Sequence, residues 1–167
     1  MSHRDARPVW GEIDLAAITH NVGLLRERAG RPVSILAPVK ANAYGHGMAA
    51  VSLHLQKLGV EGLATANFDD AVAARRAGVT IPILLYGAQL PSGHVDVLDQ
   101  GLTPSVYDRE SLQVLAQLGS RRANPVPVHI KVDAGLGRLG VRLDEAAAFA
   151  HEVLQQPGLL LEGIYTH

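Results

Sequence analysis

Short runs of apolar residues alternate along this chain with longer segments in which apolar residues recur every three or four positions. Runs of the first kind predict buried strands, and segments of the second kind predict helices with one apolar face. The strands we expect cover residues 33–40, 62–66, 81–86, 102–106, 126–132 and 159–166. The helices between them are expected over about 46–58, 68–77, 93–99, 108–118 and 143–156.

The amino-terminal part predicts one further helix. Residues 9–15 form a short strand-like entry, after which an apolar stripe from Leu15 to Leu25 ends at Gly30. Residues with short polar side chains are preferred at the position just before a helix, because their oxygens accept hydrogen bonds from the first-turn N–H groups. Three residues of this type precede helical stripes: Asp14, Asn67 and Asp108.

Strands that alternate with helices of this length form right-handed βαβ units around a parallel sheet. Six such units fit either an open doubly wound sheet or part of a (β/α)8 barrel. A complete barrel typically takes about 250 residues, whereas this chain has 167 residues and stops at the end of the sixth strand. We therefore expect an α/β fold of the (β/α)8 TIM-barrel type, incomplete with about six βα units, in an amino-terminal piece of a longer enzyme.

The composition argues against several classes of function. The formal net charge is -1, which gives no electrostatic reason for binding nucleic acid or an anionic membrane surface. No apolar run reaches the roughly 18 residues that a transmembrane helix needs, and residues 1–8 lack the apolar stretch of a secretory signal. There is no cysteine, so disulfides and thiol catalysis are excluded. We expect a soluble, cytoplasmic protein whose partner is a small molecule.

The first buried strand ends on a lysine. Residues 33–39 are mostly apolar, Lys40 follows, and two glycines then introduce a turn. In barrels this junction, at the carboxyl end of a strand, is where reactive groups stand. An amine that loses hydration there has a lowered pKa, so Lys40 could act as a nucleophile towards an aldehyde and as a base. The alternative is that Lys40 only ends the strand and points into water.

The residues around this lysine carry a resemblance to a known family. From Val39 to Gly47 the sequence is Val-Lys-Ala-Asn-Ala-Tyr-Gly-His-Gly, which closely resembles the pyridoxal-phosphate attachment motif of alanine racemases. The resemblance implies that Lys40 holds pyridoxal 5'-phosphate as a Schiff base and that Tyr44 contacts its phosphate. Pro38 departs from the family pattern, which usually has Val or Ile there. Because proline has no N–H to donate within a sheet, we expect a distorted backbone beside the lysine.

A second lysine lies on the polar face of the fifth strand. Alternate residues over 126–132 are apolar and should pack against helices, whereas His129, Lys131 and Asp133 should point into the barrel. Burying these groups unpaired would be costly, so we expect them to contact one another or a ligand. A solvated strand end is the alternative for Lys131 and Asp133. The chain has only three lysines, and two of them, Lys40 and Lys131, stand at strand ends.

The loop after this strand is rich in glycine. Residues 135–140 contain G-x-G-x-x-G, a pattern that can mark a dinucleotide site. That pattern belongs to the first strand of its fold and leads directly into a helix, and neither condition holds here. We favour a loop that presents Arg138, whose planar side chain can hold a carboxylate through two hydrogen bonds.

The same segment carries the second part of the resemblance. Residues 131–140 look like the second alanine racemase motif, with Ala134 and Leu136 where Thr and Met are common. The resemblance implies that Arg138 lies beside the cofactor oxygen and the substrate carboxylate. It also implies that Lys131 could be carboxylated, as the matching lysine often is in the family. A carbamate would turn Lys131 into an anion that can position Arg138 through charge-assisted hydrogen bonds.

The third part of the resemblance is the end of the chain. Residues 160–167 are similar to the family strand whose terminal histidine lies by the cofactor ring. The resemblance therefore implies that His167 contacts the cofactor. Residues 83–86, which end on Tyr86, are expected to be barrel core rather than a cofactor contact. No metal site is predicted.

Together the three segments resemble the barrel-forming, amino-terminal part of alanine racemase. The resemblance implies that residues 1–167 are the amino-terminal part of a PLP-binding barrel domain, without the family's carboxy-terminal domain. It implies interconversion of L- and D-alanine, which supplies D-alanine for cell-wall synthesis. Inversion needs a base on each face: Lys40 serves one, and the family's other base is a tyrosine from the partner subunit of a homodimer. No segment here corresponds to that tyrosine, so we expect little or no racemase activity from the chain alone.

Two other classes of function stay open. The chain could be a non-catalytic PLP-binding fragment or a PLP-handling barrel protein, which would share the covalent attachment at Lys40. The chain could also be an α/β phosphate-ester enzyme that does not use this cofactor, in which case no covalent attachment at Lys40 is expected. The sequence also leaves open whether the substrate is alanine, serine or a broader range of amino acids, and which oligomeric state this chain adopts.

Overall fold

The computed structural model describes residues 9–30 and 32–167. Within them, seven strands form one sheet: β1 (Leu36–Pro38), β2 (Gly62–Thr65), β3 (Ile83–Leu85), β4 (Thr103–Val106), β5 (Val126–Asp133), β6 (Val141–Arg142) and β7 (Leu159–Tyr165). All paired strands are parallel, and they neighbour one another in chain order from β1 to β5, with β6 and β7 both paired to β5. A doubly wound sheet reverses its strand order part-way. The fold is therefore an incomplete barrel, as expected.

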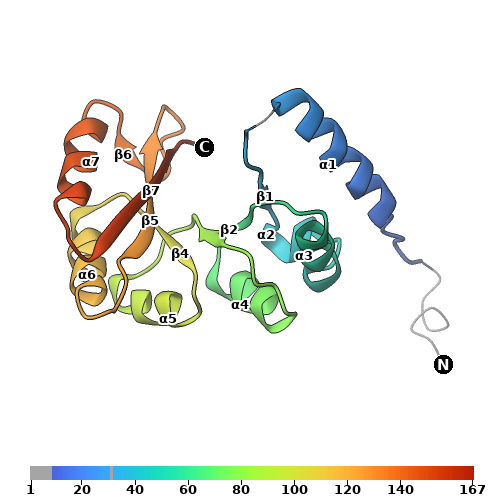
Figure 1. Cartoon of the computed structure of the whole chain (residues 1–167), viewed down its shortest axis with the longest axis horizontal. Helices are drawn as coiled ribbons and strands as arrows, with labels where there is room; N and C mark the ends of the chain where they lie inside the picture. Colours follow the sequence, from blue (N-terminus) through green and yellow to red (C-terminus); the bar gives the residue numbers. More distant parts are fainter. Residues whose placement is uncertain (1–8, 31) are drawn as a thin grey trace.

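Helices accompany the sheet along its outer side. They are α1 (Leu15–Ala29), α2 (Lys40–Tyr44), α3 (Met48–Lys57), α4 (Phe68–Arg76), α5 (His94–Asp99), α6 (Arg109–Gly119) and α7 (Ala146–Leu154), with a short 3-10 turn, η2 (Pro91–Gly93). Figure 1 shows α3 to α7 in an arc from the right of the view, below the sheet, to its left. The predicted caps are confirmed, because Asp14, Asn67 and Asp108 each accept a first-turn N–H. Across the described ranges, no helix has the length and apolar character to cross a membrane.

The outward-facing strand residues form the core with these helices. Leu63 and Ile83 are fully buried in the half formed by β1 to β3, and Val128 and Ile130 are fully buried in the other half. Burial of one such side chain stabilises the fold by about 1.5–3 kcal/mol. The intervening residues point to the inner side of the sheet. Along β5 the apolar residues join the core while Lys131 does not, which confirms the predicted division of its two faces.

The structure differs from the predicted elements mainly at their ends. Residues 9–14 form no strand, and β1 has three residues rather than the predicted eight. The helix expected from residue 46 begins at Met48, and the one expected from residue 143 begins at Ala146. The short strand β6 was not predicted. It pairs with the last two residues of β5 just after the glycine-rich loop, where backbone geometry rather than apolar periodicity decides the conformation.

Pro38 does not disturb the pairing of β1 with β2. Ile35 accepts a hydrogen bond through its carbonyl from Gly62, and the Val39 N–H donates to Ala64 at 2.9 Å. Successive residues of a strand direct their backbone groups to alternate sides. The N–H that Pro38 lacks would therefore point away from β2, to a side where β1 has no partner among the described residues. The expectation of a backbone distorted by a lost sheet donor was wrong.

The fold contains a buried histidine that should make its stability depend on pH. His94, the first residue of α5, is 1% exposed, and neither ring nitrogen has a hydrogen-bond partner within the described part of the chain. Burial lowers the pKa of His94, and the nearby Asp108 carboxylate only partly opposes this. The folded protein therefore holds His94 neutral, whereas the unfolded chain takes up a proton below about pH 6.5. The contribution of neutral His94 to the free energy of unfolding is fully present above that pH and is lost as the pH falls below it.

We expect the wild-type protein to lose up to about 1.4 kcal/mol more stability between pH 7.5 and 5.5 than His94→Leu, because leucine has no proton to bind. Urea unfolding of both proteins at the two pH values measures this difference. The other histidines are present in both proteins, so their contributions cancel in the comparison. Parallel losses in the two proteins would show that His94 is protonated inside the fold.

Candidate active site

Lys40 stands just beyond β1 on the inner side of the sheet. Its neighbour Val39 is 1% exposed and belongs to the outer core, whereas Lys40 is half-buried and its charge acts on His167, which follows β7. After the lysine the chain does not return directly to a right-handed helix. Residues 41–44 all have φ between 53° and 56°, which makes α2 a turn of left-handed helix.

This left-handed turn is costly and must be held from outside. Each non-glycine residue in this conformation costs roughly 1–2 kcal/mol relative to the right-handed one. Within the turn, the Ala43 N–H donates to the Val39 carbonyl at 2.9 Å. The Asn42 side-chain oxygen accepts from the Met48 N–H at 2.7 Å and so joins the turn to the start of α3. Such strain is typical of functional sites, where the surrounding structure enforces it.

The turn brings Tyr44 back to the lysine. Residues four apart lie on the same side of a helical turn, and the centre of the Tyr44 ring is 5.8 Å from Nζ of Lys40. Tyr44 is 56% exposed, so its hydroxyl is accessible to a ligand. The two residues thus form a pair, with an amine and a phenol at the carboxyl end of β1.

Lys131 lies deeper, on the inner face of β5. It is 2% exposed, and its Nζ donates to the Tyr86 carbonyl at 3.1 Å. The rings of Tyr86 and Tyr165 lie 5.6 and 5.8 Å from the same nitrogen. Burial lowers the pKa of Lys131, and the positive charge of Arg138 lowers it further. The solvated strand end considered for Lys131 is therefore excluded.

Tyr165, whose ring lies beside Lys131, is held by a hydrogen bond to a neighbouring strand. The Tyr165 hydroxyl, at the end of β7, lies 2.7 Å from the Ser105 hydroxyl of β4. Burial raises the pKa of Tyr165 to about 12, although the bond to Ser105 acts in the opposite direction. Tyr165 therefore stays neutral at physiological pH and can serve as a hydrogen-bond donor.

The glycine-rich loop closes on its own strand end rather than around a phosphate. The N–H groups of Gly135 and Gly137 both donate to Asp133 Oδ1 at 3.0 Å, and these bonds are the main reason why the pKa of Asp133 is lowered. At Gly140, with φ of 143°, a β-carbon would lie 2.4 Å from the Asp133 backbone nitrogen. These amides are already used within the loop, which agrees with a loop that presents Arg138.

Arg138 and His167 contact each other. Nη2 of Arg138 lies 3.1 Å from Nε2 of His167, and because a guanidinium has only donors, the ring nitrogen accepts. Desolvation lowers the pKa of His167, and the charges of Arg138, Lys131 and Lys40 lower it further. The histidine is thus kept neutral by the group of cations around it.

The structure therefore brings the four expected residues Lys40, Lys131, Arg138 and His167 to one end of the sheet. Lys40, Lys131 and Arg138 form no ion pair with any carboxylate of residues 9–30 and 32–167. Positive charges grouped on the inner side of a sheet, without a carboxylate in ion-pair contact, create a field that attracts an anion. The arrangement suits a ligand with one or more negative groups, held beside the amine of Lys40.

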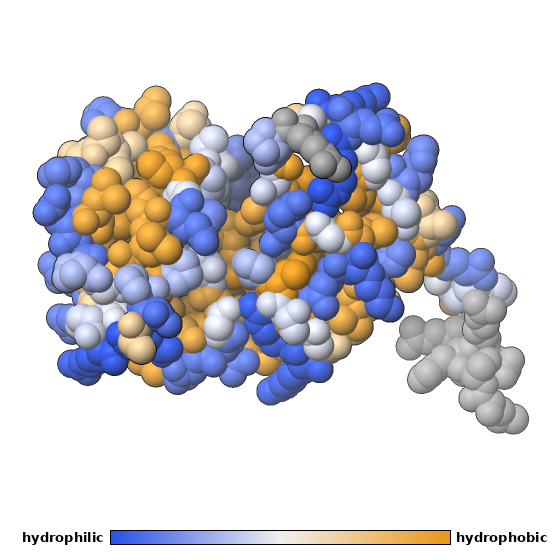
Figure 2. Space-filling view, viewed as in Figure 1, coloured by the Kyte–Doolittle hydropathy of each residue, from blue (hydrophilic) through white to orange (hydrophobic). Residues whose placement is uncertain are grey.

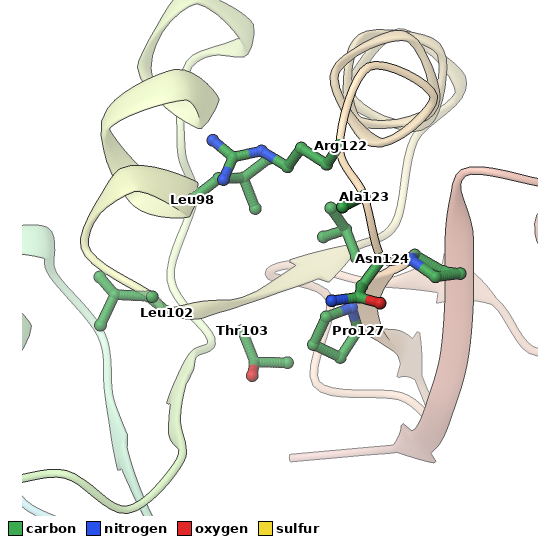
Figure 3. A pocket seen from close by; sticks show the side chains of 10 residues that line it. Leu98, Leu102, Thr103, Arg122, Ala123, Asn124 and Pro127 are labelled. Carbon is green, nitrogen blue, oxygen red and sulfur yellow. The ribbon is translucent and has the colours of Figure 1, made fainter.

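A hollow at the other end of the strands lies away from these residues. It has a volume of about 440 Å³ and is lined in part by Thr103 and Val126, which begin β4 and β5 (Figure 3). The Arg122 side chain on its wall is already paired with Asp99 at 2.6 Å. Because all strands are parallel, this hollow opens at their amino ends, whereas Lys40 and Arg138 stand beyond carboxyl ends.

Comparison with known proteins identifies the family. The family model described as alanine racemase, N-terminal domain, matches residues 13–167. The alanine racemase of Desulfovibrio desulfuricans is 38% identical over 162 residues, which cover 96% of this chain and 43% of that protein. This chain belongs to the alanine racemase family.

Solved structures of racemases have the same fold. The alanine racemase of Clostridium difficile 630 superposes with a TM-score of 0.88 at 30% identity, over 96% of this chain and 43% of that one. A histidine racemase from Leuconostoc mesenteroides subsp. sake also matches, with a TM-score of 0.80 and 26% identity over 92% of this chain and 41% of that one. This part of the racemase fold is therefore shared by proteins named for different amino acids. The chain spans less than half the length of these relatives.

Several residues at the site were not expected from the sequence. Tyr86 was assigned to barrel core, yet its carbonyl holds Lys131. Tyr165 and Ser105 were not singled out, although they form the wall on the other side of Lys131. Strand alternation could have found Tyr165 and Ser105, because each is an inner-face residue near the carboxyl end of its strand. Asp70 gave no such signal, because it lies in the helix α4 and not on a strand.

Proposed function

We propose that this chain carries the cofactor lysine and much of the anion-binding surface of a pyridoxal-phosphate-dependent racemase that interconverts L- and D-alanine. The observation that carries the proposal is the group of Lys40, Lys131 and Arg138 at one end of the sheet without a carboxylate partner within the described residues. The phosphate of a phosphorylated aldehyde and the carboxylate of an amino acid are both anions, and each could pair with these positive charges.

The residues present fit pyridoxal phosphate. Lys40 provides a half-buried primary amine, and Tyr44 provides an accessible hydroxyl 5.8 Å (ring centre to Nζ) from it. Arg138 provides a guanidinium that makes no ion pair within the described chain. When bound, this cofactor would supply a conjugated ring that accepts the electron pair left when an amino acid loses its α-proton.

Each of four residues of the chain would then have its own role. Lys40 would bind the cofactor aldehyde, and its amine would hold or return the α-proton on one face of the substrate. Tyr44 donates to the phosphate. Arg138 orients the substrate carboxylate by a two-pronged contact. His167 accepts from Arg138 and would hold its guanidinium where the cofactor binds.

The proposed compartment, oligomeric state and fate of the product rest on the resemblance to the alanine racemase family. We propose a cytoplasmic homodimer in which the partner supplies the base on the second face, and a product, D-alanine, that enters cell-wall synthesis. The division into an amino-terminal barrel part, residues 1–167, and a further domain stays a prediction. Serine or other amino acids remain alternative substrates, which a panel of amino acids in the assay below would separate.

The test is exchange of the alanine α-hydrogen. The protein, in the full form that its gene encodes, is incubated with pyridoxal phosphate and L-alanine in deuterated water. We expect deuterium at the α-carbon together with D-alanine. A covalent cofactor on Lys40 without exchange of any amino acid would favour the alternative, a PLP-handling protein without turnover. Absence of any covalent cofactor would contradict both readings.

We further expect Lys131 to carry a carbamate. Its lowered pKa favours the neutral amine, whose nitrogen can bond to the carbon of CO2 and release one proton to solvent. The resulting anion would balance Arg138 and accept hydrogen bonds from tyrosine hydroxyls. Carbon-13 NMR in labelled bicarbonate should show one carbamate signal that is absent in Lys131→Met and present in Lys57→Met. A spectrum without that signal would leave Lys131 as a plain amine bound to the Tyr86 carbonyl.

A further inference from the structure

The N–H groups that open the left-handed turn are bound by a carboxylate from another element. Asp70, in the first turn of α4, accepts from the Ala41 N–H through Oδ2 at 2.8 Å and from the Asn42 N–H through Oδ1 at 3.4 Å. The first N–H groups of any helical turn have no partner inside it. Asp70 therefore satisfies two donors directly after Lys40, at the point where the chain leaves its sheet conformation.

Asp70 is itself held in place. The Asn67 side-chain amide donates to Asp70 Oδ2 at 3.1 Å, and the Asp70 N–H donates back to Asn67 Oδ1 at 2.8 Å. Asn67 is the N-cap of α4, so the carboxylate is anchored to a helix end that also favours negative charge. An acceptor fixed in this way selects one direction for the N–H groups of Ala41 and Asn42.

We propose that Asp70 is a positioning residue for Lys40 and Tyr44. Its carboxylate holds the left-handed turn, and the turn sets the separation of 5.8 Å between Nζ of Lys40 and the Tyr44 ring. Without it, residues 41–44 relax towards right-handed conformations, and the tyrosine leaves the lysine. The importance of this placement for chemistry rests on the proposed function, because it concerns the amine and the hydroxyl that would hold the cofactor.

The matched variants come from neighbouring positions. Asp70→Ala removes both acceptors, whereas Asp70→Asn keeps one acceptor oxygen for Ala41 and presents an NH2 group to Asn42. Asp69→Ala removes the same charge from the same turn of α4, and Asp69 is an exposed residue, whereas the Ala41 and Asn42 N–H groups donate to Asp70.

The first measurement needs no cofactor. Hydrogen exchange by NMR follows two amides that do not touch Asp70: Ala43, bonded to Val39, and Gly45, bonded to Ala41. We expect Asp70→Ala to speed their exchange about tenfold or more, the loss expected for a hydrogen bond to a charged group. Asp69→Ala should leave both rates unchanged. Unchanged rates in Asp70→Ala would overturn the proposal.

The second measurement adds pyridoxal phosphate to the full form of the protein and follows covalent modification of Lys40 after borohydride reduction. We expect Asp70→Ala to slow it about tenfold or more, with partial recovery in Asp70→Asn and the wild-type rate in Asp69→Ala. A wild-type rate in Asp70→Ala, despite a loosened turn, would overturn the positioning role. A wild-type protein without modified Lys40 would contradict the proposed function instead, while the exchange rates still decide whether Asp70 holds the turn.

Discussion

Replacing Lys40 with alanine should abolish covalent binding of pyridoxal phosphate and lower turnover of alanine by about 10³-fold or more, since the change removes the nucleophile and one proton carrier together. Lys40 is the amine that the structure places beside Tyr44 on the inner side of the sheet. Borohydride reduction followed by peptide mapping measures the first effect. Racemisation of L-alanine by the full form of the protein measures the second.

Lys57 offers the control for this substitution. It is an exposed lysine at the end of α3, so Lys57→Ala removes an amine without touching the site. We expect cofactor attachment and turnover to be unchanged in this variant. Equal loss in both variants, or a labelled peptide that does not contain Lys40, would remove the basis for the assignment of the cofactor lysine.

Gly119→Ala should destabilise the fold by about 3 kcal/mol, which corresponds to a melting temperature lower by roughly 6–12 °C in a domain of this size. Gly119 ends α6 and lies against Gly158, so a β-carbon there would be 2.1 Å from the Gly158 carbonyl oxygen. That oxygen accepts the Val126 N–H at 2.9 Å. The clash would therefore push apart β5 and β7, the strands that carry Lys131 and Tyr165.

Gly93→Ala is the corresponding control. Gly93 has φ of -82°, and a β-carbon there would meet no atom within 4 Å. Alanine at such a position stabilises slightly by restricting the unfolded chain, by about 0.4–1 kcal/mol. Thermal unfolding followed by circular dichroism compares the two variants. Similar melting temperatures would mean that α6 and β7 can move apart without loss.

Much of the fold could be predicted because apolar periodicity controls it. The order of strands and helices, the helix caps and the two faces of β5 all follow from side chains that either reach the core or avoid it. The grouping of Lys40, Lys131 and Arg138 also follows, because the carboxyl ends of parallel strands meet at one edge. Alternation along a strand was therefore enough to separate the two faces of β5, whereas Arg138 and His167 were expected from the family resemblance.

The remaining features depend on contacts that no local pattern contains. The left-handed turn contradicts the preference of alanine for right-handed helix, and it forms because Asp70 binds its amides from another element. The backbone carbonyl of Tyr86 accepts a hydrogen bond from Lys131, and the type of side chain at residue 86 does not predict this contact. The end of β1 was placed too late because a buried apolar run does not show where the backbone changes hand.

The exposed face of β7 shows that apolar periodicity does not predict burial by itself. Leu160 and Ile164 on this strand are 53% and 57% exposed, and Figure 2 shows apolar surface where β7 lies at the left of the view. β7 pairs only with β5 among the described residues. From the sequence both residues were expected in a buried strand, since periodicity predicts that a side chain is apolar without predicting what covers it.

The left-handed turn also has a consequence for the order in which the site around Lys40 forms during synthesis. A ribosome makes Ala41 well before Asp70, which follows 29 residues later. Until the first turn of α4 has emerged and docked, the nascent segment after Lys40 has no carboxylate to hold its amides and reverts to ordinary backbone. Under the proposed function, the site that holds the coenzyme is therefore completed late in biosynthesis, only after α4 has docked against the turn.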